Sequence, residues 1–90
     1  MFMKDLFAIQ NESGQTGSIS LKGEEFAFSL GSKNVRSKAS YVTTVSLVGN
    51  LPLSKVKASV TFMSLMGDSQ TVDFIINEND FRALKQNLKK

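Results

Sequence analysis

Apolar and polar residues alternate along most of this 90-residue chain, and that alternation restricts its fold more than any other feature. It is clearest in Lys55–Leu65, where every second residue from Val56 to Phe62 is apolar. Successive side chains of a β-strand point to opposite faces, so a period of two predicts half-buried strands. Further strands are expected at Asp5–Gln10, Gly17–Lys22, Glu25–Leu30, Ser40–Val48 and Gln70–Ile76. The connections are too short for parallel crossovers, which predicts an antiparallel meander of five to six strands.

The C-terminal segment has a different period. Phe81, Leu84 and Leu88 recur at helical spacing and form one apolar stripe. Asn77 is a candidate N-cap, and the pattern predicts a helix of about three turns. One narrow stripe must lie on a sheet, either its own or a partner's, and we expect it to cover a sheet across a two-fold interface. The predicted class is therefore mainly β (α+β), a single domain over residues 1–90 that forms a homodimer or a higher assembly.

Positive charge is concentrated in the middle of the chain. Between Phe26 and Gly67 there is no acidic residue, whereas the whole chain has a net charge of +3. The five cations of this stretch are Lys33, Arg36, Lys38, Lys55 and Lys57. A local positive field suits a polyanion, although an ordinary solvated surface also explains it. The first three cations lie in Gly31–Lys38, a polar segment that we expect to be a loop.

Several chemistries are disfavoured by the residues that the chain lacks. It has no His and no Cys, which excludes Ser-His-Asp and Cys-His nucleophiles, thiolate metal sites and disulfides. Its acids show no calcium-loop spacing, and no glycine motif for phosphate is present. We therefore expect a protein that is not an enzyme and uses no metal or cofactor. No segment has the length and apolarity of a membrane span, and the start lacks the pattern of a secretion signal, so we expect neither a membrane partner nor export.

The two strongest predicted strands, Ser40–Val48 and Lys55–Leu65, can place their polar residues on one face of the sheet. That face would carry only hydroxyl and ammonium groups, from Thr44, Ser46, Lys55, Lys57, Ser59 and Thr61. Lysines neutralise phosphates and short hydroxyls donate hydrogen bonds to nucleic acid, and the cations at Lys33, Arg36 and Lys38 would add affinity. The alternative is a plain solvated face whose lysines guard a sheet edge. The reverse face, including Val45 and Leu47, would take the helix.

The order of hairpin, basic loop, two long strands and C-terminal helix resembles the coat proteins of small single-stranded RNA bacteriophages. The similar segments are Asn11–Leu21, Phe26-Ala27, Arg36–Ala39, Thr44–Leu47 and Lys55–Phe62. The resemblance implies a capsid protein, found in the virion or the host cytoplasm, whose two long strands bind RNA. It also implies tight dimers whose helices clasp the partner's sheet. The positions that fit RNA contacts of that family are Thr44, Ser46, Lys55 and Ser59.

The tail supports a second resemblance. Val72–Ile76 followed by Asp80-Phe81 and Leu84-Lys85 is similar to the end of Whirly-type and transcriptional-coactivator single-stranded DNA-binding domains. This implies a dimeric sheet that binds single-stranded DNA. A third class remains, a small inhibitor or interaction module whose sheet binds another protein. The sequence thus leaves three hypotheses: single-stranded RNA, single-stranded DNA, or a protein partner.

Overall fold

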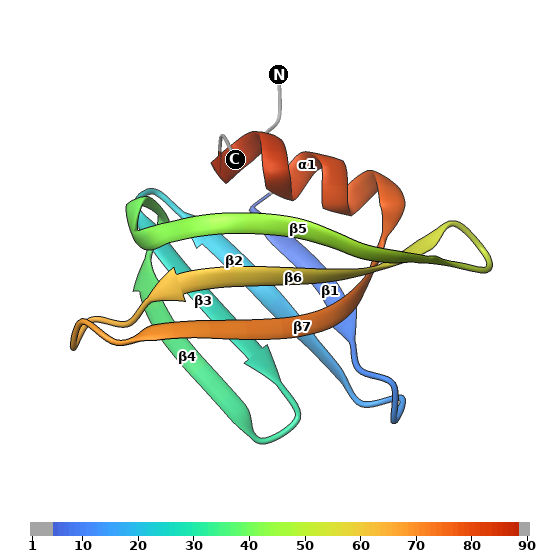
Figure 1. Ribbon diagram of the computed structural model, residues 1–90, viewed down its shortest axis with the longest axis horizontal. Coiled ribbons are helices and arrows are strands. Elements are labelled where there is room, and N and C mark those ends of the chain that lie inside the picture. Colours follow the sequence, from blue (N-terminus) through green and yellow to red (C-terminus); the bar gives the residue numbers. More distant parts are fainter. Residues whose placement is uncertain (1–4, 89–90) are drawn as a thin grey trace.

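The computed structural model describes residues 5–88, which form a seven-stranded sheet and a C-terminal helix (Figure 1). The elements are β1 (Leu6–Gln10), β2 (Thr16–Lys22), β3 (Glu25–Leu30), β4 (Lys33–Lys38), a 3-10 turn (Ala39–Tyr41), β5 (Val42–Leu51), β6 (Lys55–Met63), β7 (Ser69–Asn77) and α1 (Glu78–Leu88). The strand order is β4-β3-β2-β1-β7-β6-β5, and every neighbouring pair is antiparallel. The predicted mainly-β class with one C-terminal helix is confirmed, but the described residues form seven strands and not five to six. They also do not form one continuous meander, because the consecutive strands β4 and β5 lie at opposite edges of the sheet.

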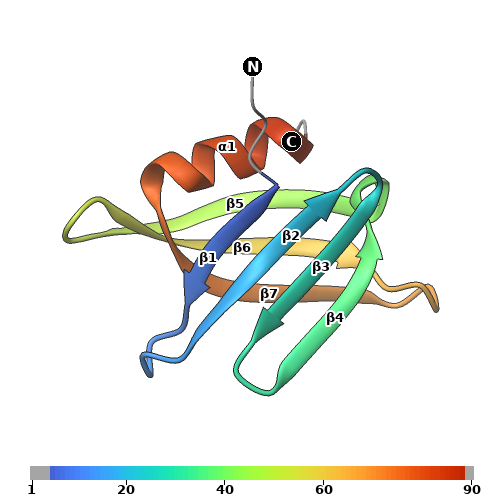
Figure 2. The ribbon, with the colours of Figure 1, turned by 180° about the vertical axis from the view of Figure 1, so that it is seen from behind.

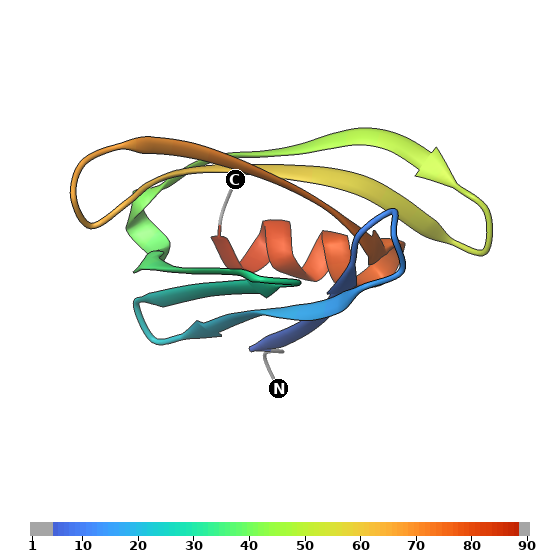
Figure 3. The same cartoon turned by 90° about the horizontal axis from the view of Figure 1, so that it is seen from below.

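The sheet folds over on itself and forms two layers (Figure 3). Strands β1–β4 make one layer, strands β5–β7 make the other, and the two cross steeply when viewed from either side (Figures 1 and 2). Within residues 5–88, strand pairing crosses from one layer to the other only between β1 and β7, through the pairs Ile9↔Ile76 and Gln10↔Ile75. The helix α1 lies between the layers along one open side of the fold (Figure 3). Each layer therefore has an inner face toward the core and an outer face toward solvent.

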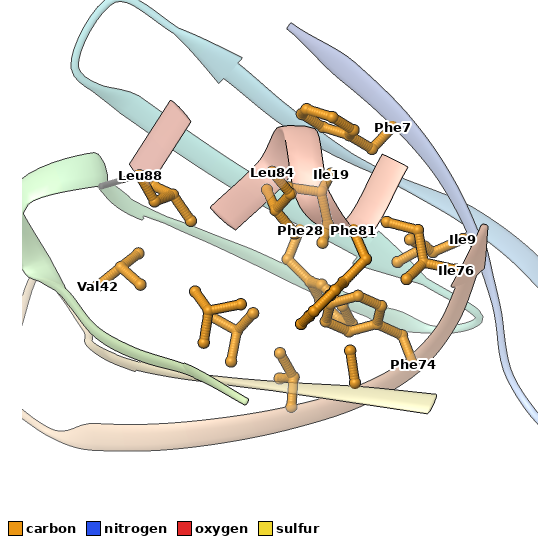
Figure 4. Packing of buried hydrophobic residues seen from close by; sticks show 14 of the residues in the cluster. Phe7, Ile9, Ile19, Phe28, Val42, Phe74, Ile76, Phe81, Leu84 and Leu88 are labelled. Carbon is orange, nitrogen blue, oxygen red and sulfur yellow. The ribbon is translucent and has the colours of Figure 1, made fainter. Parts of the chain in front are cut away.

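Aromatic rings from opposite layers meet in the core (Figure 4). The rings of Phe26 in β3 and Phe62 in β6 have centroids 5.3 Å apart, and those of Phe28 and Phe74 are 6.1 Å apart. All four side chains are buried. Burial of one such side chain contributes about 1.5–3 kcal/mol, so the contact between layers is a large part of the stability of this small domain.

The strand β4 was not predicted from the sequence. Gly31–Lys38 was expected to be a loop, but Lys33–Lys38 pairs with β3 over its whole length. Within β4, Val35 lies opposite Phe28 and Ser37 lies opposite Phe26 on the inner face. Ser37 is buried, and its hydroxyl donates a hydrogen bond to the carbonyl oxygen of Met63. Because Lys33 and Ser37 take two of the three inward positions, with Lys33 at the exposed end of the strand, β4 has almost no apolar alternation in its sequence.

The turn between β2 and β3 explains the shift in apolar spacing from Leu21 to Phe26. Lys22 pairs with Glu25, so Gly23 and Glu24 form a two-residue hairpin turn. Gly23 has a φ of +61°, a conformation that glycine adopts without steric cost. This turn lets Leu21 and Phe26 lie opposite each other on the same face.

The predicted helix is confirmed, with its N-cap. The side-chain oxygen of Asn77 accepts a hydrogen bond from the backbone N–H of Asn79 at 2.9 Å. The stripe of Phe81, Leu84 and Leu88 is buried in the same cluster as the strand residues of its own chain (Figure 4). We had expected this stripe to cover a sheet across a two-fold interface. In the structure the helix instead fills the opening between the two layers of its own sheet, so these three residues need no partner.

The strand β5 begins and ends later than predicted. The 3-10 turn occupies residues 39–41, and the strand runs from Val42 to Leu51 with register shifts between Val42 and Thr44 and between Leu47 and Gly49. Leu47 was expected to lie under the helix with Val45. It pairs with Ala58 but its side chain is 51% exposed, because β5 is an edge strand with a neighbour on one side only.

Candidate nucleic-acid interface

The six polar residues predicted for one face of the two long strands do lie together. Thr44 pairs with Thr61 and Ser46 pairs with Ser59, while the intervening pair Val45↔Val60 points into the core. Lys55 and Lys57 follow on the same side of β6 by strict alternation. We call this outer surface of β5, β6 and β7 the hydroxyl face. It consists of Thr44, Ser46, Lys55, Lys57, Ser59 and Thr61, extended by Thr71 and Asp73 of β7.

The third strand changes the chemistry of this face. Thr71 lies beside Thr61, with the two hydroxyl oxygens 3.0 Å apart. The sequence predicts a face of hydroxyl and ammonium groups only. The structure corrects this prediction, because the carboxylate residue Asp73 lies opposite Ser59. Asp73 alternates with Val72 and Phe74, and this pattern could have placed it on the outside of its strand. The predicted meander already places this strand beside β6, but the register that sets Asp73 opposite Ser59 does not follow from the sequence.

Lys57 is held by a carboxylate from a distant part of the chain. Its ammonium group donates a hydrogen bond to the Glu12 carboxylate at 2.6 Å, and Glu12 lies in the turn between β1 and β2. The hydrogen bond and the opposite charge lower the pKa of Glu12 and raise the pKa of Lys57. The charge of Asp73 raises the pKa of Lys57 slightly further. Within residues 5–88, Lys55 forms no ion pair, so the two lysines of the face differ in availability.

A shallow hollow lies where the β1–β2 turn approaches this face. Its volume is about 280 Å³, and its lining includes Asn11, Glu12, Lys57, Asp73 and Ile75. Both cationic and anionic groups therefore line it. The alternation of Gln70–Ile76 placed Ile75 on the outer side of β7, yet it is buried, because the β1–β2 turn covers this position. Nothing in the local sequence around Glu12 or Asn11 indicates that they would reach β6, since 45 positions separate Glu12 from Lys57.

The other three predicted cations are not part of the hydroxyl face. Arg36 and Lys38 lie opposite Ala27 and Glu25, on the outer face of the β1–β4 layer. The two layers have their outer faces on opposite sides of the molecule (Figure 3). The Arg36 guanidinium is 4.0 Å from the Glu25 carboxylate, and the Lys38 ammonium is 5.6 Å from the ring centroid of Tyr41.

Lys33 lies at the start of β4, opposite Leu30, and is exposed. The structure thus brings six of the nine predicted binding residues together and leaves Lys33, Arg36 and Lys38 apart. The reason is that their segment is a strand of the other layer and not a mobile loop beside β5.

The sequence matches no known family model and no curated protein. Over the described residues, no group of three carboxylate, His or Cys side chains is arranged to hold a metal ion. The helix in that range is too short and too polar to cross a membrane.

Proposed function

We propose that this chain is a non-enzymatic protein that binds single-stranded RNA through the hydroxyl face of β5–β7. The observation that carries the proposal is the register between β5 and β6, which aligns four hydroxyl side chains in two cross-strand pairs beside two lysines. Hydroxyls can donate to phosphate, ribose or base edges, and lysines displace counterions from phosphates. The 2′-hydroxyl of RNA offers such a face one more donor and acceptor per nucleotide than DNA does.

The ion pair of Lys57 with Glu12 would weaken the binding of a phosphate to this lysine. A phosphate that reaches Lys57 must compete with the Glu12 carboxylate, which is already 2.6 Å away. Lys55 has no such competitor among the described residues. The proposed contact is therefore led by Lys55 and the hydroxyl pairs, with Lys57 joining when its carboxylate is displaced.

The test is a titration of a labelled single-stranded RNA with the protein at several salt concentrations, followed by fluorescence anisotropy. Each phosphate neutralised on a single strand contributes about 0.7 to the dependence of log affinity on log salt. The double variant K55Q/K57Q should therefore flatten this dependence by about 0.7 where Lys55 alone neutralises a phosphate, and by about 1.4 where Lys57 has left Glu12 and does so too. The matched control R36Q/K38Q removes the same charge from the other layer and should retain the wild-type slope. If K55Q/K57Q keeps the wild-type slope, or if the control loses as much, this face is not the binding site.

The same titration separates the other two hypotheses. A DNA strand of equal sequence that binds as tightly as the RNA would favour a single-stranded DNA-binding protein. A protein that binds neither strand would contradict the proposal and favour an interaction module for another protein.

The coat-protein resemblance extends the proposal to assembly into a shell. That family uses its helices to clasp a partner's sheet, whereas α1 here packs on its own chain. Any dimer of this chain must therefore use another contact. Purification from the expression host is the test, since particles of megadalton mass that contain host RNA would support a shell. A small species with no RNA would contradict it.

A further inference from the structure

One edge of the sheet has little protection against pairing with another strand. The strand β5 is ten residues long and carries no charged residue and no proline from Val42 to Leu51. Its Leu47 and Val48 side chains are 51% and 56% exposed. An edge strand presents a row of unpaired backbone N–H and C=O groups, and proteins usually block such an edge with charges, prolines, β-bulges or a short strand. Of these devices β5 has only its two register shifts.

The opposite edge carries the usual protection. The strand β4 has only six residues and includes Lys33, Arg36 and Lys38. Two copies of β4 would repel each other, whereas two copies of β5 would not. The register shifts of β5 lie on either side of Thr44–Leu47, which leaves this short central stretch regular.

We propose that β5 pairs antiparallel with β5 of a second copy, in a two-fold register centred on Ser46. In this register Leu47 lies opposite the partner's Val45, and both side chains belong to the inner face. Leu51 then comes near the partner's Tyr41, and both of these residues are exposed in the single chain. A two-fold contact uses the same patch on both subunits, which suits a strand that is uncharged throughout.

This pairing would also extend the proposed binding face. Thr44 and Ser46 belong to the hydroxyl face, and the two-fold register places those of both copies side by side at the centre. The two hydroxyl faces become one continuous surface. This consequence rests on the proposed function, but the pairing itself does not.

The first test measures mass in solution by sedimentation equilibrium with no nucleic acid present. Wild-type protein should be a dimer, and Leu47→Lys should shift it to monomer, because the two added charges would be diagonal neighbours on the same face, within reach of each other across the edge. Met66→Lys is the matched control, since Met66 is 90% exposed in the β6–β7 turn and away from β5. A monomeric wild type would overturn the proposal. Equal dissociation by both variants would overturn it as well.

The second test needs no loss of stability and uses the absence of cysteine from this chain. In Ser46→Cys, the two copies place their new thiols opposite each other, with Cα atoms about 4.5–5.5 Å apart, a span that a disulfide can bridge. Mild oxidation should give a covalent dimer. Ser59→Cys, on the neighbouring strand β6, should stay monomeric on a denaturing gel. A Ser46→Cys protein that fails to cross-link, or a Ser59→Cys protein that cross-links as fast, would overturn the register.

Discussion

At the scale of single residues, the contact between Glu12 and Lys57 has the most consequences for the proposed face. The pKa of Glu12 is held below its ordinary value of 4.5, so the pair contributes stability above that pH and loses it as the pH falls through the lowered value. The pKa of Lys57 is raised above 10.5, so its contribution is present below that pH and is lost as the pH rises through the raised value. At neutral pH the pair is intact, and Lys57 is engaged by a carboxylate.

Removing that carboxylate should make Lys57 available. We expect Glu12→Gln to bind single-stranded RNA about two- to fivefold more tightly than wild type, in line with the modest strength of exposed ion pairs. The advantage should disappear as the pH falls below the lowered pKa of Glu12, where the wild-type carboxyl is also neutral. Anisotropy titrations at two pH values measure this, and Asp68→Asn in the β6–β7 turn is the control for net charge. An equal gain in Asp68→Asn would show that the charge of the whole molecule, and not Lys57, is responsible.

At the scale of elements, the sequence predicted those whose own residues carry the pattern. The strands β6 and β7 alternate regularly and α1 has its stripe and its Asn77 cap, so each was located within about two residues. The strand β4 was missed because it exists through its pairing with β3, and its inward residue Ser37 is polar. The hydroxyl face was half predictable for the same reason. Alternation predicts which side of a strand each residue occupies. It does not predict the register that places Asp73 beside Ser59, or the path of the β1–β2 turn that brings Glu12 to Lys57.

The turn between β5 and β6 stores strain that can be measured. Leu53 has a φ of +63° and its side chain is 88% exposed, so no packing compensates for the left-handed backbone. Such a conformation costs a leucine of order 1 kcal/mol, and Asn tolerates it better. Leu53→Asn should therefore raise the free energy of unfolding by about 0.5–1 kcal/mol in urea denaturation. Met66→Asn removes an equally exposed apolar side chain at a residue without a positive φ and should give no such gain. Equal stabilisation in both variants would attribute the effect to surface polarity instead of backbone strain.

At the scale of the whole molecule, the two layers are joined through few backbone pairs, and α1 completes the core between them. The N–H of Glu78 donates to the Ser54 carbonyl oxygen at 2.8 Å, which ties the start of the helix to the β5–β6 turn. The sequence could not decide whether the apolar stripe would lie on its own sheet or on a partner's, because both burials satisfy the same pattern. The bend of the sheet decides it, since the opening between the layers accepts the helix of the same chain.

This arrangement predicts how the helix contributes to stability. Leu84 is fully buried, and Leu84→Ala should lower the free energy of unfolding by about 2–5 kcal/mol, the usual cost of deleting buried methyl groups and leaving a cavity. Because the contact lies within one chain, the difference between wild type and variant should be the same at low and at high protein concentration, even if β5 also mediates dimerisation. Arg82→Ala, on the exposed side of the helix, loses only its surface pair with Glu78 and should change stability little. Urea denaturation at several concentrations measures both variants. A Leu84→Ala defect that grows on dilution would mean that the helix packs on a partner's sheet, which would reverse the assignment of α1 to its own core.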